Sequence, residues 1–365
     1  MVSILVVYKL GVLYGDGIGP EIVKSSVEVL KAATKKAANG TEFEYSELPM
    51  GWEGIEKYND PVPEITKQGL ESTDGWLMGP HDSAAYPDEH RMVKRNPSGE
   101  LRHYFDLYSN VRPSKSLPGC KSLVGNADLV IFRENSEGFL SDRNMYKGSG
   151  EVLVTPDIAL VTGVFTRKAT ERIAHEAFKL AMTRRKKVTI VHKANVIKLA
   201  YGLFKDVCYE VAKEYPEVKV DDYHIDAMTA HLVRRADDFD VIVTTNLFGD
   251  ILSDLAGELV GSLGLSASLN TNGKQAMAQA AHGSAPDISG QNVANPTSML
   301  LSTVMLLQWL STNHKDTKLN EIAEIMESAI INIIAKGPTT HDLGGKASTT
   351  EFTAAIIEKI TEIKK

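Results

Sequence analysis

The sequence predicts an α/β protein of two domains with substantial parallel strand pairing. Short apolar runs typical of strands alternate with longer amphipathic segments typical of helices. The chain has 365 residues, more than one hydrophobic core usually serves, so two domains are expected. The sequence contains no internal repeat, low-complexity tract or Ser/Pro linker, which indicates that the chain crosses between its domains more than once.

The predicted elements follow from this alternation. Strands are expected near residues 10–14, 75–79, 127–133, 188–193, 218–225 and 241–246. Helices are expected over residues 20–38, 167–182, 198–214, 297–312, 320–335 and 350–363. Residues 148–166 differ, because two strand-like runs follow each other there with Gly and Pro but no helix between them. They predict either a β arm that pairs with another subunit or an ordinary surface hairpin.

The stretch VIVTTNLFGDILSDLAG, residues 241–257, is a clear case of strand followed by helix. Val241 to Thr245 is a β-branched run long enough to cross a sheet, and Asn246 is a residue type that caps helices. Leucine and isoleucine then recur at helical spacing.

Two aspartates of this helix occupy positions where their charges do not stabilise the helix. Asp250 and Asp254 fall at the margin of the apolar arc, and Glu258 continues the same ladder. Like charges four residues apart cost roughly 0.2 to 0.5 kcal/mol per pair, and no Lys or Arg occupies a neutralising position on the helix. The ladder is either a solvated acidic edge or part of an oxygen site for Mg²⁺ or Mn²⁺.

Composition and charge restrict the classes of function. Hydrophobic residues make up 43% of the chain and charged residues 24%, as in an ordinary globular protein. The net charge of −7 argues against nucleic-acid binding, which needs a concentrated basic surface. Two cysteines cannot form a disulfide framework, and the apolar N-terminus is interrupted by Lys9 and too short to span a bilayer. A cytoplasmic protein without membrane partners is expected.

Three arginines lie at or near the ends of apolar segments. They are Arg102 in GELRHYF, Arg112 in SNVRP and Arg133 in LVIFRENSEG. Side chains at such ends converge on one cleft in α/β proteins, and guanidinium groups match carboxylates in shape and charge. They predict a site for a small polyanionic acid, with surface salt bridges as the alternative for each arginine.

A lysine and an aspartate end two further predicted strands. Lys193 follows VTIVH and precedes Ala194 and Asn195, and Asp226 ends VDDYHID. A lysine in this place either acts as a base or extends into water. Asp226 would complete an oxygen site with the aspartates at 250 and 254.

Two loops carry candidate ligand groups. Residues 15–21, GDGIGPE, lack the G-x-G-x-x-G spacing of a dinucleotide fingerprint and predict a tight turn at a helix start. Residues 282–296, HGSAPDISGQNVANP, are too rich in Gly, Pro, Ser and Asn for helix or strand. They offer backbone N–H groups for phosphate, an imidazole and one carboxylate, that of Asp287. The carboxylate would accept hydrogen bonds from ribose hydroxyls and repel a 2′-phosphate.

These motifs together resemble the β-decarboxylating dehydrogenases, the family of 3-isopropylmalate, isocitrate, homoisocitrate and tartrate/D-malate dehydrogenases. The motifs that carry the resemblance are GDGIGPE, LRHYFDLYSNVRP, RENSEG, HKANV, NLFGDILSDLAG, HGSAPDISGQNVANP and DLGG, in the family's order. The resemblance implies a two-domain α/β fold that is not a Rossmann fold, with parallel-rich mixed sheets and a β arm. It implies a large cofactor-binding domain of residues 1–107 and 262–365, a small domain of residues 108–261 with the arm and the metal and substrate residues, and a homodimer with shared active sites.

The resemblance also implies roles for single residues. Arg102, Arg112 and Arg133 are similar to the clamp on the substrate's malate moiety. Asp226, Asp250 and Asp254 are similar to the ligands of Mg²⁺ or Mn²⁺, and Lys193 is similar to the catalytic lysine, with Asp226 and Lys193 supplied by the partner subunit. The residues that match the NAD site are Asn195, His282, Gly283, Ser284, Ala285, Asp287 and Asn295.

Two positions depart from the family pattern. Leu140 stands where the family has a tyrosine, and leucine neither donates a proton nor holds a relay. Tyr146 or a water molecule is a candidate to donate the proton in place of that tyrosine. Gln279 replaces a glutamate that usually precedes the cofactor-loop histidine by three residues.

The segment RNPSG, residues 95–99, is where the family distinguishes the group on carbon 3 of the substrate. Isopropylmalate enzymes have leucines just before the first arginine, whereas this chain has Asn96, Ser98 and Gly99 in that region. Loss of a leucine contact weakens discrimination by roughly 1 to 3 kcal/mol. The expected reaction is therefore NAD- and metal-dependent oxidative decarboxylation of a (2R,3S)-type 2-hydroxy acid, with isocitrate or homoisocitrate favoured over 3-isopropylmalate, tartrate or D-malate. The alternative from another class is a catalytically impaired regulatory subunit, which Leu140 would suit.

Overall fold

The computed structural model describes residues 6–91, 95–139, 145 and 150–363, and the chain forms two compact units. Unit 1 consists of Met1–Leu101, Leu117–Lys121 and Gly261–Lys365, and unit 2 consists of Arg102–Ser116 and Ser122–Val260. The first boundary thus falls before Arg102 rather than after residue 107, and the short segment Leu117–Lys121 returns to unit 1.

Unit 1 is built on five strands in the order β2-β1-β3-β12-β11. The strands are β1 Val6–Leu13, β2 Thr41–Glu47, β3 Gly75–Met78, β11 Ala267–Thr271 and β12 Ala276–Ala280. All neighbours pair in parallel except β11 and β12, which form an antiparallel pair. Its helices are α1 Gly19–Ala37, α2 Trp52–Tyr58, α3 Glu64–Glu71, α4 Asp88–Arg91, α5 Pro97–Tyr104, α10 Thr297–His314, α11 Thr317–Lys336 and α12 Thr349–Glu362, with the last three residues of α5 in unit 2. The four long helices α1, α10, α11 and α12 bury their apolar faces in one core with β1, β11 and β12.

Unit 2 is built on five strands in the order β4-β5-β10-β8-β9. The strands are β4 Ser109–Lys115, β5 Asp128–Glu134, β8 Lys187–His192, β9 Lys219–His224 and β10 Val241–Thr244. Only β4 and β5 pair antiparallel. The helices are α6 Arg167–Met182, α7 Ala200–Ala212, α8 Ile225–Arg235 and α9 Asn246–Val260.

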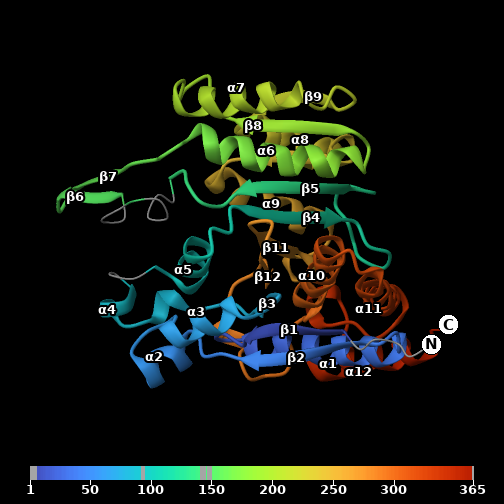
Figure 1. Ribbon diagram of the computed structural model, residues 1–365. Coiled ribbons are helices and arrows are strands. Elements are labelled where there is room, and N and C mark those ends of the chain that lie inside the picture. The colour runs from blue at the N-terminus through green and yellow to red at the C-terminus, as the bar shows by residue number, and fades with distance from the viewer. Residues whose placement is uncertain (1–5, 92–94, 140–144, 146–149, 364–365) are drawn as a thin grey trace. The chain divides into compact units, whose positions relative to one another are not determined.

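Helices cover both faces of this second sheet (Figure 1), and each face carries its own core. Along β5, Val130 and Phe132 pack with α6 and α7, whereas Leu129 and Ile131 pack with α8 and α9. Side chains alternate between the faces of a strand, so a continuous apolar run serves both cores. The carboxyl ends of β5, β8 and β10 are left at one edge of the sheet, where polar residues follow.

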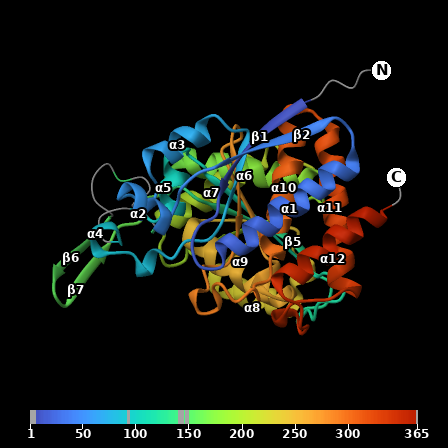
Figure 2. The same ribbon diagram turned by 90° about the horizontal axis from the view of Figure 1, so that it is seen from below.

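Strands β6 Glu151–Thr155 and β7 Ile158–Val161 form a separate antiparallel ribbon within unit 2. In Figures 1 and 2 the ribbon projects away from the sheet and helices of its own unit. Its six large apolar side chains, Val152, Leu153, Val154, Ile158, Leu160 and Val161, are all more than half exposed. The expectation of two strands without an intervening helix is confirmed, and the ribbon has no apolar cover within the described part of its unit.

The α/β fold class is confirmed, and the structure adds strands that the apolar pattern did not indicate. These are β2, β4, β11 and β12, whose sequences TEFEYSE, SNVRPSK, ASLNT and AMAQA are polar or composed of small residues. Such strands are specified by neighbours distant in the sequence rather than by their own hydrophobicity. No helix in the described ranges combines the length and apolar character needed to cross a bilayer.

Candidate active site

The acidic ladder on α9 faces a cluster of buried arginines. Asp250 and Asp254 lie on the margin of a helix whose opposite face, including Leu252 and Ala256, is fully buried. Their side chains are 46% and 52% exposed, so the carboxylates lie at the rim of the protein interior rather than in open water. The charge that the helix itself lacks comes from arginines on neighbouring elements.

Arg112 and Arg133 supply that charge from β4 and β5. Arg112 Nη1 lies 3.5 Å from Asp250 Oδ1 and 3.4 Å from Asp254 Oδ1, and it donates to Ser253 Oγ at 2.6 Å. Arg133 pairs with Asp250 at one end of its guanidinium group. Both arginines are less than one-tenth exposed, and their planar forks hold the two carboxylates together.

Asn246 and Gly249 hold Arg133 against the first turns of α9. The Asn246 side-chain oxygen accepts from Arg133 Nε at 2.9 Å and from Nη2 at 2.7 Å, so this side chain serves the arginine. A Cβ atom at Gly249 would lie 2.6 Å from the Arg133 side chain, and glycine is therefore needed for the helix to approach β5 so closely. The motif NLFGD thus builds the arginine site as well as the acidic ladder.

The electrostatics of the two aspartates differ. Burial raises the pKa of Asp250, but Arg133, Arg112 and Arg102 outweigh burial and hold it below its usual value. Burial likewise raises the pKa of Asp254, and the charge of Asp250 adds to the effect, so that it stays above its usual value despite Arg112. Arg102, at the end of α5, is also buried and contributes to the field at Asp250. Buried guanidinium groups gathered beside two carboxylates suit an anionic ligand.

Lys193 and Asp226 form a second pair in unit 2. Lys193 follows β8, and Asp226 lies in the first turn of α8 rather than at the end of a strand, because β9 already ends at His224. Lys193 Nζ donates to Asp226 Oδ1 at 2.5 Å, since β8 and β9 are parallel neighbours whose carboxyl ends lie together. This hydrogen bond lowers the pKa of Asp226.

The three aspartates of the expected metal site do not all meet within one chain. No group of three or more His, Cys, Asp or Glu side chains is placed to hold a metal ion anywhere in the described ranges. Asp250 and Asp254 share Arg112, whereas Asp226 pairs with Lys193. Asn195 lies exposed in the turn that follows Lys193. One chain thus presents two half-sites.

In unit 1, the glycine loop after β1 supports the long loop at residues 282–296. Ile18 N–H donates to Ser284 O at 2.9 Å, and the Ser289 hydroxyl donates to Gly17 O at 2.9 Å. Gly17 has a positive φ of 58°, and a Cβ atom there would lie 2.0 Å from Ser284 O. Only glycine fits this contact. The glycine loop was expected to be an unspecific turn, and its packing against the 282–296 loop was not foreseen.

The residues of the 282–296 loop fall into an anchored set and an exposed set. Asn295 is buried, and its amide donates to Asp342 Oδ2 at 2.9 Å, which ties the loop to the DLGG motif. Gly283 and Asp287 are exposed, and Ala285 adopts a left-handed φ of 39° before a short 3₁₀ turn at Pro286–Ile288. Partial burial lowers the pKa of His282, so its imidazole is neutral near pH 7.

Asn96 and Ser98 lie at the start of α5 with different surroundings. Asn96 is exposed, and its side-chain oxygen accepts from Gly99 N–H at 2.7 Å. Ser98 is buried, with its hydroxyl 2.7 Å from Gln279 Nε2 and 2.9 Å from His81 Nε2. Gln279, one of the two positions that depart from the family pattern, is therefore hydrogen-bonded directly to Ser98. Leu140 and Tyr146 lie outside the described residues.

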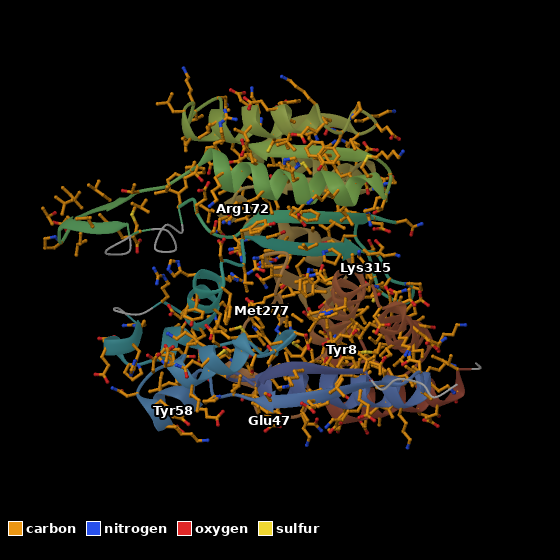
Figure 3. The ribbon with its side chains drawn as sticks, in the orientation of Figure 1. Tyr8, Glu47, Tyr58, Arg172, Met277 and Lys315 are labelled. Atoms are coloured by element: carbon orange, nitrogen blue, oxygen red, sulfur yellow. The ribbon has the colours of Figure 1, made fainter. Side chains whose placement is uncertain are left out.

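A pocket of about 390 Å³ in unit 2 contains Arg102 and a buried carboxyl group that sequence reasoning missed. Its other lining residues include Asn135, Glu137, Thr166 and Arg172 of α6, which is labelled in Figure 3. Burial raises the pKa of Glu137 to about 7, and its two oxygens accept from the Thr166 N–H and hydroxyl, both at 2.8 Å. Glu137 belongs to the motif RENSEG, but a charged residue in such a polar segment is equally typical of the protein surface, so the sequence did not indicate that it is buried.

Comparison with known proteins covers nearly the whole chain. A family model described as isocitrate/isopropylmalate dehydrogenase matches residues 9–358. The chain is 40% identical to a 3-isopropylmalate/3-methylmalate dehydrogenase of Methanocaldococcus jannaschii, over 97% of this chain and 99% of that protein. It is 41% identical to an isocitrate/homoisocitrate dehydrogenase of Thermus thermophilus, over 98% and 99%. The crystal structure of isocitrate dehydrogenase from Methylococcus capsulatus superposes with a TM-score of 0.86 at 36% identity, covering 97% of this chain and 99% of that one.

Proposed function

Because this chain belongs to the isocitrate/isopropylmalate dehydrogenase family of decarboxylating dehydrogenases, we propose that it oxidises and decarboxylates a (2R,3S)-type 2-hydroxy acid with NAD and Mg²⁺ or Mn²⁺. Isocitrate or homoisocitrate is the favoured substrate. The observation that carries the proposal is the convergence of the buried Arg112 and Arg133 on the carboxylates of Asp250 and Asp254.

The arginine–aspartate cluster has the donors that both a metal ion and an acid require. Aspartate oxygens are the ligands that Mg²⁺ and Mn²⁺ prefer, and Asp250 and Asp254 remain half exposed toward an entering ion. The guanidinium groups of Arg102, Arg112 and Arg133 all act on the carboxylate of Asp250. They would also pair with the carboxylates of the substrate, and forked hydrogen bonds would fix the orientation of the acid.

The chain's own residues then divide the work of the reaction. The arginines bind and orient the acid, and Lys193 takes the proton of its 2-hydroxyl group. Asp250 and Asp254 would hold the divalent ion, which would supply Lewis-acid chemistry at that hydroxyl, and the loop at residues 282–296 would hold NAD, which would supply the hydride acceptor. Carbon 3 must gain a proton after CO₂ leaves, and Leu140 has no proton to give.

We also propose that the enzyme is a homodimer in which Lys193 and Asp226 of one copy complete the arginine–aspartate cluster of the other. Apolar side chains border both half-sites: Val196 and Leu199, after Lys193, are 66% and 89% exposed, and Ile251, beside Asp250, is 50% exposed. The apolar β6–β7 ribbon is a further surface that a second copy would cover.

The NAD proposal rests on the loop at residues 282–296 in unit 1. Its backbone is held by the glycine loop and by Asp342, while the carboxylate of Asp287 is exposed. An exposed carboxylate accepts hydrogen bonds from ribose hydroxyls and repels a 2′-phosphate, which favours the binding of NAD over NADP.

The preference for a polar side group rests on the start of α5. Asn96 is exposed, and no leucine stands at 96, 98 or 99 to form an apolar wall. The printed names of the relatives include both 3-isopropylmalate and isocitrate or homoisocitrate, so the substrate is best decided by direct assay.

The test is NADH formation with Mn²⁺ and each of isocitrate, homoisocitrate, 3-isopropylmalate, D-malate and tartrate. We expect turnover with isocitrate or homoisocitrate, none after chelation of the metal, and lower activity when NADP replaces NAD. Faster turnover of 3-isopropylmalate would refute the substrate assignment. Absence of turnover across the panel, together with ligand-induced thermal stabilisation, would favour a regulatory subunit, the function that Leu140 would suit.

A further inference from the structure

A partly buried chain of hydrogen bonds starts at the residue before Lys193. His192 is the last residue of β8 and is 2% exposed. Its Nε2 lies 2.8 Å from Asp222 Oδ2 on β9, and the hydroxyl of Tyr209 on α7 donates to Asp222 Oδ1 at 2.6 Å. Three neighbouring elements thus meet at one histidine that is not part of the proposed reaction.

The hydrogen bonds of His192 fix its tautomer. The backbone N–H of Ala194 donates to His192 Nδ1 at 3.1 Å, so Nδ1 has no proton and Nε2 donates to Asp222. Burial lowers the pKa of His192 against the pull of Asp222, which agrees with a neutral ring. Protonation of Nδ1 would break the bond to Ala194. Nδ1 of the ring can therefore accept from Ala194 because Nε2 carries the proton and donates to Asp222.

The peptide group that is hydrogen-bonded to His192 is the one that links Lys193 to Ala194. The N–H of Ala194 and the C=O of Lys193 belong to the same peptide unit, and that carbonyl accepts from Val196 N–H at 3.2 Å and Ile197 N–H at 3.0 Å. Both ends of the unit are thus held, and the plane of the peptide is fixed relative to β8. The Lys193 side chain leaves from this fixed point to reach Asp226 Oδ1 at 2.5 Å.

We propose that His192, oriented by Asp222 and Tyr209, is a positioning residue that sets the direction of the Lys193 side chain through the Ala194 peptide. The inference rests on the proposed function for its catalytic consequence, but the positioning itself is a property of unit 2 alone. His192 does not touch the substrate in this proposal. Its contribution is to spare Lys193 the conformational search that would slow proton transfer.

Two substitutions at His192 separate positioning from simple stability. Asparagine is short, and its Oδ1 would take the place of Nδ1 as the acceptor for Ala194, while the bond to Asp222 is lost. Glutamine is longer, and its Nε2 would keep the bond to Asp222, while the acceptor for Ala194 is lost. We expect His192→Gln to lower kcat by about 10-fold with little change in KM, and His192→Asn to stay within about 3-fold of the wild type.

The matched control is His175→Gln in the same unit. His175 is partly buried on α6, and its Nδ1 lies 2.9 Å from the hydroxyl of Tyr215, in a hydrogen bond separate from those that join His192, Asp222 and Tyr209. We expect His175→Gln to leave kcat unchanged, with thermal unfolding measured for all variants. Equal kcat for the asparagine and glutamine variants, or a loss in the control as large as in His192→Gln, would overturn the inference.

A second readout does not need catalysis. Trace labelling with acetic anhydride, read by mass spectrometry, gives the reaction rate of each lysine in the intact protein. We expect His192→Gln to label Lys193 severalfold faster than the wild type, because the amine would spend less time bonded to Asp226, whereas His192→Asn and His175→Gln should match the wild type. This result in a protein that turns over none of the five acids would support positioning while the proposed function fails.

Should His192→Gln not fold, Tyr209→Phe tests the same chain of bonds more gently. It removes only the hydroxyl that orients Asp222, and we expect faster Lys193 labelling by a smaller factor. Unchanged Lys193 labelling in whichever of these two variants folds would overturn the inference.

Discussion

At the scale of single residues, the two α9 aspartates take part both in the packing of the fold and in the proposed chemistry. The sequence suggested that positive charge must come to Asp250 and Asp254 from outside the helix. Arg112 and Arg133 bring it from two strands, so the ladder is tolerated in the absence of any ligand. In the proposed function, these arginines would bind the substrate acid and the aspartates would bind the ion.

Substitution of Asp250 by asparagine separates these two roles. The carboxamide removes the anionic partner of the buried Arg133, so we expect the free energy of unfolding to fall by about 1–3 kcal/mol. Loss of a metal-ligand oxygen should weaken Mn²⁺ binding and lower kcat by at least about 100-fold. Calorimetric titration with Mn²⁺, chemical unfolding and the NADH assay measure the three effects.

Glu258→Gln is the control for Asp250→Asn, because Glu258 is exposed on the same helix and continues the same ladder. It should change neither ion affinity nor rate. If Asp250→Asn binds Mn²⁺ and turns over as well as Glu258→Gln does, the metal assignment of α9 is wrong.

At the scale of elements, a buried carboxyl group joins the end of β5 to the start of α6. Glu137 accepts both hydrogen bonds of Thr166, the residue that caps α6 by accepting from Ala169 N–H. Glu134, two residues after Phe132, is buried beside it and accepts from Ser136 and Glu137 N–H groups. Burial raises the pKa of each of these glutamates.

The raised pKa of Glu137 predicts a pH dependence of stability. Its pKa is 4.5 ordinarily and about 7 in the folded protein, so between these values the folded state binds the proton more tightly than the unfolded state. The stabilisation is present in full below the ordinary value and is lost as the pH rises through the folded value. The free energy of unfolding of the wild type should fall by about 3 kcal/mol over this range, and Glu137→Gln, which cannot ionise, should lack this fall.

Chemical unfolding of both proteins at a series of pH values measures the difference in slope. Glu171→Gln, a change at a half-exposed side chain on α6, should keep the wild-type slope. A wild-type slope in Glu137→Gln would show that this carboxyl group titrates normally.

At the scale of the whole molecule, the proposed homodimer would join the two half-sites of unit 2 into one site. Lys193 pairs with Asp226, Asp250 and Asp254 pair with arginines, and exposed apolar side chains border both sets. A monomer would leave these surfaces and the β6–β7 ribbon in water.

Complementation between inactive variants tests this arrangement. Lys193→Ala and Asp250→Ala should each be inactive alone. Unfolded together and refolded as a mixture, they should recover about a quarter of the wild-type activity, because half of the dimers would be mixed and each would hold one intact site.

Mixing without subunit exchange is the control and should give no activity. Recovery after refolding would be impossible if Lys193 and Asp250 act within the same chain. Continued silence in the refolded mixture, with mixed dimers demonstrated by mass spectrometry, would refute the shared site.

The sequence by itself determined the order of the strands and helices with clear apolar periodicity, the family, and the motifs from which every proposed site residue comes. Local patterns suffice there, because the apolar spacing of α9 or the composition of the 282–296 loop is written in adjacent residues. Strands β4, β11 and β12 escaped prediction because polar or small residues form strands only when neighbours from elsewhere in the chain supply their hydrogen bonds.

Only the tertiary structure decided which charged groups meet. Arg133 and Asp250 are more than a hundred residues apart, as are Gly17 and Ser284, and no local pattern encodes either contact. The hydrogen bonds that join Tyr209, Asp222, His192 and the Ala194 peptide likewise connect different elements. Such contacts arise because packing of the sheets and helices fixes the ends of distant segments side by side, and the charge of a group then depends on neighbours that only folding supplies.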